Sequence, residues 1–256
     1  IKIQNCEISI NFFTNIDEIN KITEISHYTN NYIKYLKSWL FLCVFYSKGT
    51  YNSMVFDIYL TPFVKKMPNS NIETSYTNGF KSIHVNSGYT YTDNLNQLKS
   101  VVIFRKEEWF KVFLHESLHS FSLDFQEINM SSYENMMKVN FKYINSDFNV
   151  NESYCEFWAN IMNLCYYSYD FSKGNFKDFV VSFEINIRLE QLFSIMQLNK
   201  ILNFYNISYN TMVSSKNNNS IKTLYKEDTN VFCYYVIKSI LLYNYEELFE
   251  WCNKNN

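Results

Sequence analysis

Residues 113–121 read Phe-Leu-His-Glu-Ser-Leu-His-Ser-Phe, and this stretch combines a helical period with two histidines. Apolar residues recur around it at three- and four-residue steps, which predicts one buried stripe of a helix (Phe110, Phe113, Leu114, Leu118 and Phe121). Residues four apart share one face of a helix, so the imidazoles of His115 and His119 can point toward the same place. The side chain of Glu116 projects from the helix axis about 100° away from that of His115. It can therefore lie near the point where the two imidazoles meet without being a ligand there.

The spacing H-E-x-x-H is typical of a zinc site in which two imidazoles hold the metal and the glutamate acts as general base. Zinc lowers the pKa of its bound water to about 7, and the carboxylate accepts the proton as the water attacks a carbonyl. The chain has only 4 histidines, and two of them fall in this pattern. The alternative is an amphipathic core helix in which the pattern is fortuitous. We therefore predict one catalytic Zn²⁺ held by His115 and His119, with Glu116 as the base.

The residues that follow His119 exclude one class of zinc site. Metzincins continue as H-E-x-x-H-x-x-G-x-x-H, whereas Ser122 and Phe125 occupy the glycine and last histidine positions here. Asp124 is nearby, but on a continuing helix it would point away from the metal-binding face. The third ligand is therefore expected further along the chain.

Residues 151–156 read Asn-Glu-Ser-Tyr-Cys-Glu and begin a second helical segment. The two motifs together resemble those of the gluzincin metallopeptidases, the group that includes thermolysin, over roughly residues 100–165. The resemblance implies that Glu152 is the third zinc ligand, and that Glu156, one turn later, holds the distal nitrogen of a zinc-binding histidine. From the residues alone, Glu152 could instead be a solvated glutamate in a first helical turn, with Glu156 as the ligand.

The same resemblance implies a peptide or protein substrate and a residue that stabilises the developing oxyanion. In gluzincins a histidine or tyrosine of the later lobe often has this role, and no histidine follows His119. Tyr234 and Tyr235 are the candidates, although each could equally be a core or surface aromatic. A substrate-binding strand edge is also implied, with candidates at Val85–Tyr91 and Val101–Phe104.

Periodicity divides the chain into strands followed by helices. We predict a helix over residues 15–38 and strands at Trp39–Tyr46, Met54–Phe63, Phe80–Tyr91 and Ser100–Arg105. From Lys106 onward the periodic stretches are helical, at Asn151–Tyr169, Phe176–Phe204, Thr229–Tyr243 and Tyr245–Cys252. Loops are expected at Asn71–Gly79, Thr92–Asn96 and Ser214–Ser220. The order predicts an α+β, zincin-like fold: a mixed lobe over residues 1–125 and a helical lobe over residues 126–256.

Composition limits the remaining possibilities. With 256 residues, 47% of them hydrophobic, the chain can bury a sizeable core as one catalytic unit. A net charge of -2 gives no basic surplus for nucleic acid. The longest apolar run, Trp39–Tyr46, is too short to span a bilayer, which needs about 20 residues. The 6 cysteines form no C-x-x-C pair, which favours a reducing, intracellular location without excluding secretion.

The sequence is rich in Asn, Lys, Ile, Tyr and Phe and has a single alanine, Ala159. This bias is typical of A/T-rich coding, as in some protists, large DNA viruses and insect viruses. Ala159 lies seven residues after Glu152, where a small side chain would let two helices approach closely. His84 alternates with apolar neighbours as in a strand, and is expected to face the cleft or to be an ordinary partly buried histidine.

Three functions are consistent with these patterns. The first is a zinc peptidase, with the endo- or exopeptidase mode left open. The second is a zincin-fold protein that binds metal but has become a structural, virion or interaction component. Because Glu116 is intact, the first is favoured over the second. The third, a helical protein with a fortuitous motif, predicts no bound zinc.

Overall fold

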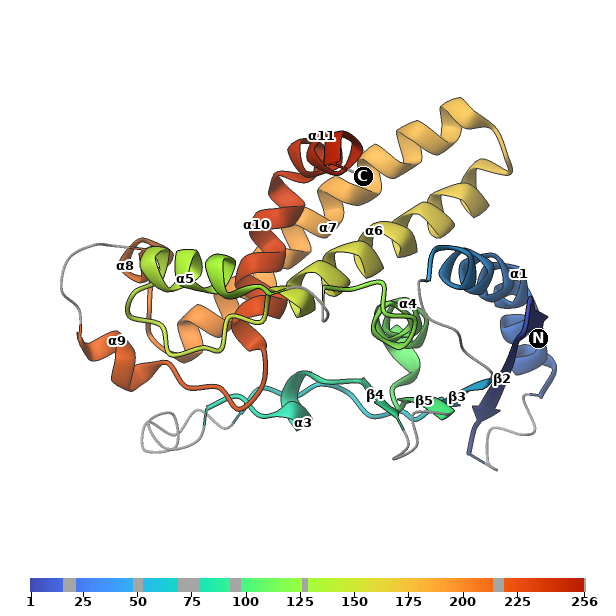
Figure 1. Ribbon diagram of the computed structural model, residues 1–256, viewed down its shortest axis with the longest axis horizontal. Helices are drawn as coiled ribbons and strands as arrows, with labels where there is room; N and C mark the ends of the chain where they lie inside the picture. The colour runs from blue at the N-terminus through green and yellow to red at the C-terminus, as the bar shows by residue number, and fades with distance from the viewer. Residues whose placement is uncertain are drawn as a thin grey trace. The chain divides into compact units, whose positions relative to one another are not determined.

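The computed structural model describes residues 1–15, 22–47, 53–68, 79–92, 98–125, 129–213 and 219–255 (Figure 1). The chain forms two compact units. Unit 1 comprises residues 1–64 and 86–126, and unit 2 comprises residues 65–85 and 127–256. Unit 1 contains a β-sheet with helices, and unit 2 is mainly helical, so the predicted α+β class is confirmed.

Unit 1 is built on a five-stranded mixed sheet with the strand order β1-β2-β3-β5-β4. The strands are β1 (Lys2–Ile3), β2 (Cys6–Phe13), β3 (Ser53–Tyr59), β4 (Gly88–Thr92) and β5 (Leu98–Ile103). The central strands β2, β3 and β5 are parallel, whereas β1 and β4 are antiparallel edge strands. Alternate residues of β3 are fully buried (Met54, Phe56 and Ile58), so one face of the sheet forms the core.

Two helices accompany this sheet in unit 1, α1 (Ile22–Tyr46) and α4 (Trp109–Ser120) (Figure 1). A short 3₁₀ turn, η2 (Lys106–Glu108), leads into α4. Helix α4 packs against β4 and β5 and also contacts α1. The rings of Phe113 on α4 and Phe56 on β3 have centroids 5.0 Å apart and are both fully buried. The apolar stripe that was predicted for residues 110–121 is therefore the face that α4 presents to the core.

The strand predicted at Trp39–Tyr46 is wrong, because these residues continue helix α1. The buried positions follow a helical spacing (Tyr35, Leu36, Trp39, Leu40 and Cys43). A short continuous apolar run is compatible with a strand or a helix. Here the run continues the helical spacing of the residues before it, and it is therefore helical. Residues 16–21 of the predicted helix lie outside the described residues.

The strand predicted at Phe80–Tyr91 is correct only in its second half. Residues Ser82–Val85 form a short helix, α3, and β4 begins at Gly88. His84 therefore lies in a helical turn, and its Nδ1 accepts a hydrogen bond of 2.9 Å from the backbone N–H of Lys81. Strand β2 was not predicted, although its burial alternates. Most of the predicted loops lie outside the described residues.

Unit 2 is dominated by two long antiparallel helices, α6 (Val150–Ser172) and α7 (Phe176–Phe204) (Figure 1). Both confirm predicted helices. Besides α3, the unit contains these shorter helices: α5 (Ser131–Asn140), α8 (Tyr209–Val213), α9 (Asn219–Leu224), the π-helical segment η3 (Phe232–Ile237), α10 (Lys238–Tyr243) and α11 (Tyr245–Asn255). Helix α10 packs on α6 and α7. An aromatic core joins residues far apart in sequence, including Phe80, Phe148, Tyr205 and Phe232.

In the described part of the chain, none of the helices combines the length and the apolar character needed to cross a membrane.

Candidate metal centre

The two histidines of the H-E-x-x-H pattern lie side by side on α4. Their Nε2 atoms are 3.1 Å apart and their ring centroids 4.9 Å apart. His115 is buried and the side chain of His119 is 11% exposed. The predicted convergence of the two imidazoles is thus present within one helix of unit 1.

Asp124 holds the opposite edge of one of these rings. The Nδ1 atom of His119 is 2.7 Å from Oδ2 of Asp124, whose side chain is only 1% exposed. The expectation that Asp124 points away from the histidines is wrong, because α4 does not continue to it. The helix ends at Ser120, and Ser122 adopts a left-handed conformation with a φ of 52°.

The turn after α4 has the hydrogen bonds of a Schellman motif. The backbone N–H of Leu123 donates to the carbonyl of Leu118, and that of Ser122 donates to the carbonyl of His119. A left-handed serine costs on the order of 1 kcal/mol relative to glycine, which usually occupies this position. The turn reverses the chain and brings Asp124 back to His119. Ser122, at the glycine position of the metzincin pattern, is the residue that adopts the left-handed conformation here.

The hydrogen bond to Asp124 determines how His119 can act. A carboxylate oxygen accepts a hydrogen bond from the Nδ1–H tautomer of a neutral imidazole, and in that tautomer Nε2 presents a lone pair. This lone pair faces Nε2 of His115. Two nitrogen lone pairs at 3.1 Å repel each other unless a proton or a cation lies between them. The contact is therefore a hydrogen bond when one of the rings carries a proton on Nε2, and the same two nitrogens are candidate metal ligands.

Glu116 lies beside the histidines and is fixed by the edge strand of the sheet. The hydroxyl of Thr90 on β4 donates to Oε2 of Glu116 at 2.8 Å, and Glu116 is 8% exposed. Gly88 allows this approach. A Cβ at position 88 would lie 2.8 Å from Cγ1 of Val112 and 3.3 Å from Cγ of Glu116. Strand β4 therefore positions the predicted general base.

A lysine side chain binds the C-terminal end of α4. Nζ of Lys99 on β5 donates to the carbonyl of Ser120 at 2.8 Å. Positive charge is favourable at the C-terminus of a helix because of the helix dipole. The hydroxyl of Thr90 also lies 3.2 Å from that of Ser120. Strands β4 and β5 thus fasten the end of α4 that carries His119.

The remaining predicted site residues lie in unit 2. Glu152 is in the first turn of α6, is partly buried, and accepts a hydrogen bond of 3.0 Å from the hydroxyl of Tyr234. Glu156 lies one turn later, and its backbone carbonyl accepts from Asn160 at 2.7 Å. Tyr235 packs against the aromatic core of the unit. Tyr234 belongs to the π-helical segment η3, a type of irregularity frequent at functional sites.

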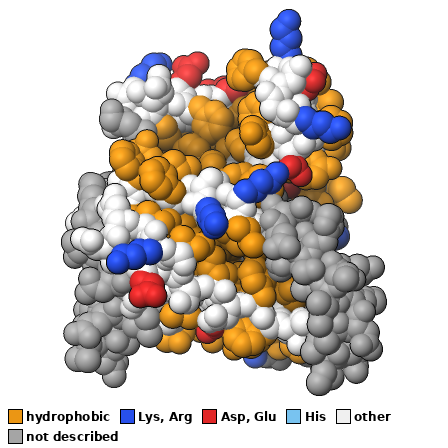
Figure 2. Space-filling model, turned by 90° about the vertical axis from the view of Figure 1, so that its right-hand side faces the viewer, with side chains coloured by type: hydrophobic (Ala, Val, Ile, Leu, Met, Phe, Trp, Pro, Cys, Tyr) orange, Lys and Arg blue, Asp and Glu red, His pale blue; other side chains and the backbone are white. Residues whose placement is uncertain are grey.

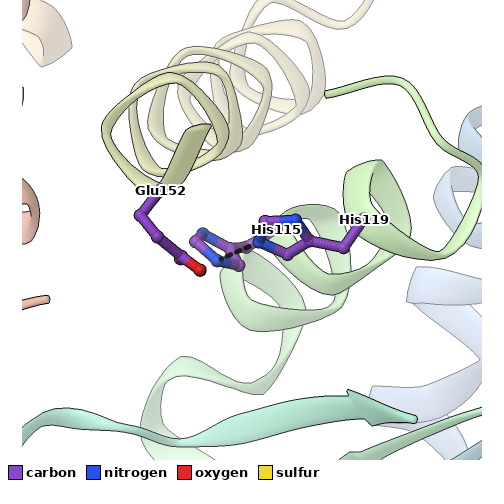
Figure 3. Close-up of side chains that lie close together, drawn as sticks. All are labelled: His115, His119 and Glu152. Carbon is purple, nitrogen blue, oxygen red and sulfur yellow. Dashed lines mark hydrogen bonds between the residues drawn. The ribbon is translucent and has the colours of Figure 1, made fainter. Parts of the chain in front are cut away.

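The structure thus groups the predicted residues in two sets. Unit 1 brings together His115, Glu116 and His119, and unit 2 brings together Glu152 and Tyr234. Figure 3 draws the three predicted ligands, with the two imidazoles on α4 and the carboxylate on α6. Ala159, the single alanine, is fully buried on α6.

Three of the cysteines, Cys43, Cys165 and Cys233, have surroundings unlike those of a metal ligand. Burial raises the pKa of the Cys165 thiol to about 11 and that of Cys233 to about 12, and it raises the pKa of Cys43 well above its usual range. These thiols stay protonated at neutral pH, whereas a metal ligand is a thiolate. All 6 cysteines are free in the structure.

Two residues of the site were not predicted from the sequence. Thr90 could not be paired with Glu116 without knowing where β4 lies. Asp124 was considered but assigned to a continuing helix, because a serine gives no signal of a left-handed turn. A carboxylate five residues after the second histidine is the signal that could have identified it, given a helix end at residue 120.

No protein-family model matches the chain. An uncharacterized protein of Acanthamoeba polyphaga mimivirus is 23% identical over 178 residues, which is 69% of this chain and 45% of that protein. The match therefore spans less than half the length of the viral protein. No solved structure matches the chain.

Proposed function

We propose that this protein is a zinc-dependent peptidase in which His115 and His119 hold the metal and Glu116 acts as general base. The observation that carries the proposal is the pair of Nε2 atoms 3.1 Å apart, with the far nitrogen of His119 bound to a buried aspartate. Imidazole oriented by a carboxylate is the usual arrangement of a zinc-binding histidine.

The distance between the two nitrogens fits zinc. Zinc–nitrogen bonds of about 2.0–2.1 Å at a tetrahedral angle separate two ligand nitrogens by about 3.3–3.4 Å. The observed separation of 3.1 Å is within a few tenths of an ångström of that value. Little side-chain movement is needed to accommodate the ion. Zinc bound there would supply Lewis acidity, lowering the pKa of a water molecule to about 7.

Glu116 and Thr90 supply the proton-transfer chemistry. The carboxylate of Glu116 accepts a proton from the attacking water and later delivers it to the leaving amine. Thr90 donates to Oε2 of that carboxylate and so fixes its orientation. The low exposure of Glu116 limits competition from bulk water. General acid–base assistance of this kind contributes about 10²–10⁴-fold to a rate.

Glu152 is the proposed third ligand. His115, His119 and Glu152 are a candidate metal-binding group by the atoms they offer, two ring nitrogens and one carboxylate oxygen. This is the donor set of thermolysin-type zinc sites. Tyr234 donates a hydrogen bond to Glu152, which would orient the carboxylate. Tyr234 therefore has a positioning role in the proposal, in addition to its proposed role as an oxyanion donor.

An extended peptide is the proposed substrate, and β4 is the strand that would bind its backbone. Strand β4 is at the edge of the sheet and carries Thr90, which contacts the general base. Edge strands bind extended peptides through main-chain hydrogen bonds. The alternating exposed residues of β4 are Tyr89 and Tyr91, at 51% and 50%.

The test combines zinc binding with peptide cleavage. We expect about one zinc per chain, lost when His115 and His119 are replaced by alanine. Glu116→Gln should retain the zinc but reduce chelator-sensitive cleavage of a denatured protein by about 10²–10⁴-fold. Glu107→Gln is the matched control, because Glu107 is exposed just before α4. Full cleavage by Glu116→Gln would remove the assigned base.

The third ligand is tested separately. Glu152→Ala should weaken zinc binding more than Glu156→Ala, since both carboxylates lie on α6 one turn apart. The reverse order would assign the metal to Glu156. Zinc bound by the wild-type chain without cleavage of any peptide would favour a structural or interaction role. A chain with no affinity for zinc would contradict the whole proposal.

A further inference from the structure

Helix α7 has an unusual distribution of polar and apolar residues. Three positions of its buried face are polar: Ser182, Gln191 and Ser194 are 7%, 3% and 1% exposed. Each has a partner in unit 2. Gln191 donates to the carbonyl of Leu242 at 2.7 Å, and the hydroxyls of Ser194 and Ser239 are 2.6 Å apart. Asn186 on α7 donates to the hydroxyl of Ser182 within the helix at 3.2 Å, and to the hydroxyl of Ser168 on α6 at 3.0 Å. These bonds fix the rotation of α7 about its axis.

The opposite face of α7 is apolar and exposed. Five residues at steps of four, four, three and four form what is here called the α7 stripe (Val181, Ile185, Leu189, Leu192 and Met196). Each member is 56–59% exposed. The stripe is about 22 Å long at 1.5 Å per residue. A helix that is apolar on both faces is normally buried on both.

The spacing of the stripe specifies the shape of its partner. Steps of three and four residues form the seam of a coiled coil, so the partner is expected to be another helix. Exposed hydrophobic side chains also occur at the α6–α7 turn, where Tyr167, Phe171 and Phe176 are 63%, 71% and 76% exposed, and Figure 2 shows one face of the molecule with many such side chains. Contiguous apolar surface of this kind marks an interaction site.

The stripe is nearly symmetric about Leu189. Val181 and Met196 lie eight and seven residues from Leu189, and Ile185 and Leu192 lie four and three residues from it. The charges beyond its ends follow the same symmetry with opposite signs. Asp178 and Lys200 are both exposed and are each eleven residues from Leu189. A two-fold axis at Leu189 therefore places apolar residues against apolar residues and Asp178 against Lys200 of the second helix.

We propose that the α7 stripe is a homodimer interface, in which α7 of one copy packs antiparallel against α7 of a second copy. A two-fold interface uses the same patch on both chains, so the patch must be complementary to itself. The near-symmetry of the stripe and the opposed charges at its ends meet that requirement. One helix pair is at the small end of specific interfaces, so dissociation in the micromolar range is expected.

Sedimentation of the 256-residue chain over a range of micromolar concentrations tests the proposal. The wild-type chain should pass from monomer to dimer. Leu189→Glu places two like charges at the symmetry axis and should weaken the dimer by about 100-fold or more. Val139→Glu is the matched control, because Val139 is 78% exposed on α5, away from the stripe. This variant should dimerise as the wild type does.

A charge exchange tests the antiparallel register. At low salt, Asp178→Lys alone or Lys200→Asp alone opposes like charges twice and should weaken the dimer severalfold. The double variant should restore it. A wild-type chain that stays monomeric at several hundred micromolar overturns the proposal, and so does a dimer that Leu189→Glu leaves intact. Circular dichroism melting of each variant confirms that the helices are retained.

Discussion

Helices α4 and α7 depart from the ordinary pattern of polar and apolar residues in opposite ways. Helix α4 is buried yet carries polar side chains in its interior: His115, Glu116, Ser117 and Ser120 are all at most 8% exposed. Helix α7 is exposed along one side yet carries apolar side chains there. Ordinary helices bury the apolar face and expose the polar one.

The difference between the two helices indicates a different role for each. Buried polar groups need partners, and on α4 the serines use the helix backbone while His119 and Glu116 use Asp124 and Thr90. Residues held in this way are suited to chemistry. The exposed apolar groups on α7 need no hydrogen-bond partners, but their contact with water is unfavourable. They are suited to association.

The largest effect on the free energy of unfolding should come from truncating a buried apolar side chain on α4. The comparison is the same truncation on the exposed stripe of α7. Phe113 is fully buried, so Phe113→Ala should lower the free energy of unfolding by about 3–5 kcal/mol. Leu192 is 59% exposed on the stripe, so Leu192→Ala should change it by at most about 0.5 kcal/mol when measured below dimerising concentrations. Denaturant unfolding measures both.

Equal destabilisation by the two substitutions would contradict the contrast between the helices. A large effect of Leu192→Ala in the monomer would mean that the stripe is covered within the chain. Leu192→Ala should instead weaken the dimer, which sedimentation measures independently of unfolding. Together the two readouts separate a residue that stabilises the fold from one that stabilises an interface.

The next effect concerns the polar side of α4. Asp124→Asn keeps an acceptor for Nδ1 of His119 but removes the negative charge that fixes its tautomer. Zinc affinity should fall by about 10–100-fold, as for other carboxylates that orient a zinc-binding histidine. Competition with a chromophoric chelator measures the affinity without depending on activity.

Asp57→Asn is the matched control for this substitution. Asp57 lies on β3 and also accepts one hydrogen bond, from Asn11 at 2.9 Å, on the exposed part of the sheet. The change should leave zinc affinity unaltered. A cobalt-substituted Asp124→Asn chain should also show an altered absorption spectrum, because the imidazole reorients. Unchanged affinity and spectrum would assign Asp124 a purely structural role in the turn after α4.

The sequence predicts these two helices well and their surroundings less well. Both α4 and α7 are periodic over many residues, so their type and position follow from apolar spacing. The helical state of Trp39–Tyr46 does not follow from apolar spacing, because eight consecutive apolar residues fit a strand as well as a helix. The H-E-x-x-H pattern predicts that His115, Glu116 and His119 lie together, because the motif lies within one helix. The position of Asp124 depends on the turn after α4, and that of Thr90 depends on the order of the strands. Neither can be read from the spacing of residues along the sequence.

The smallest effect tests why α7 does not rotate to bury its stripe. Gln191 is bonded to the carbonyl of Leu242, and its Oε1 accepts from Arg188 at 3.0 Å. Gln191→Leu keeps the volume but removes both bonds, and should lower the free energy of unfolding by about 1 kcal/mol. Gln197→Leu, on a half-buried position of the same helix, should change it by less than about 0.5 kcal/mol.

The inner polar bonds then have a purpose beyond stability. If they hold the rotation of α7, losing the bonds of Gln191 lets the helix turn and bury part of the stripe. The Gln191→Leu chain should therefore also dimerise more weakly than the Gln197→Leu chain. A Gln191→Leu chain that is more stable than the wild type and still dimerises fully would show that packing, without these bonds, sets the helix. In that case the exposed stripe would be a property of the whole bundle, and the buried polar residues of α7 would need another explanation.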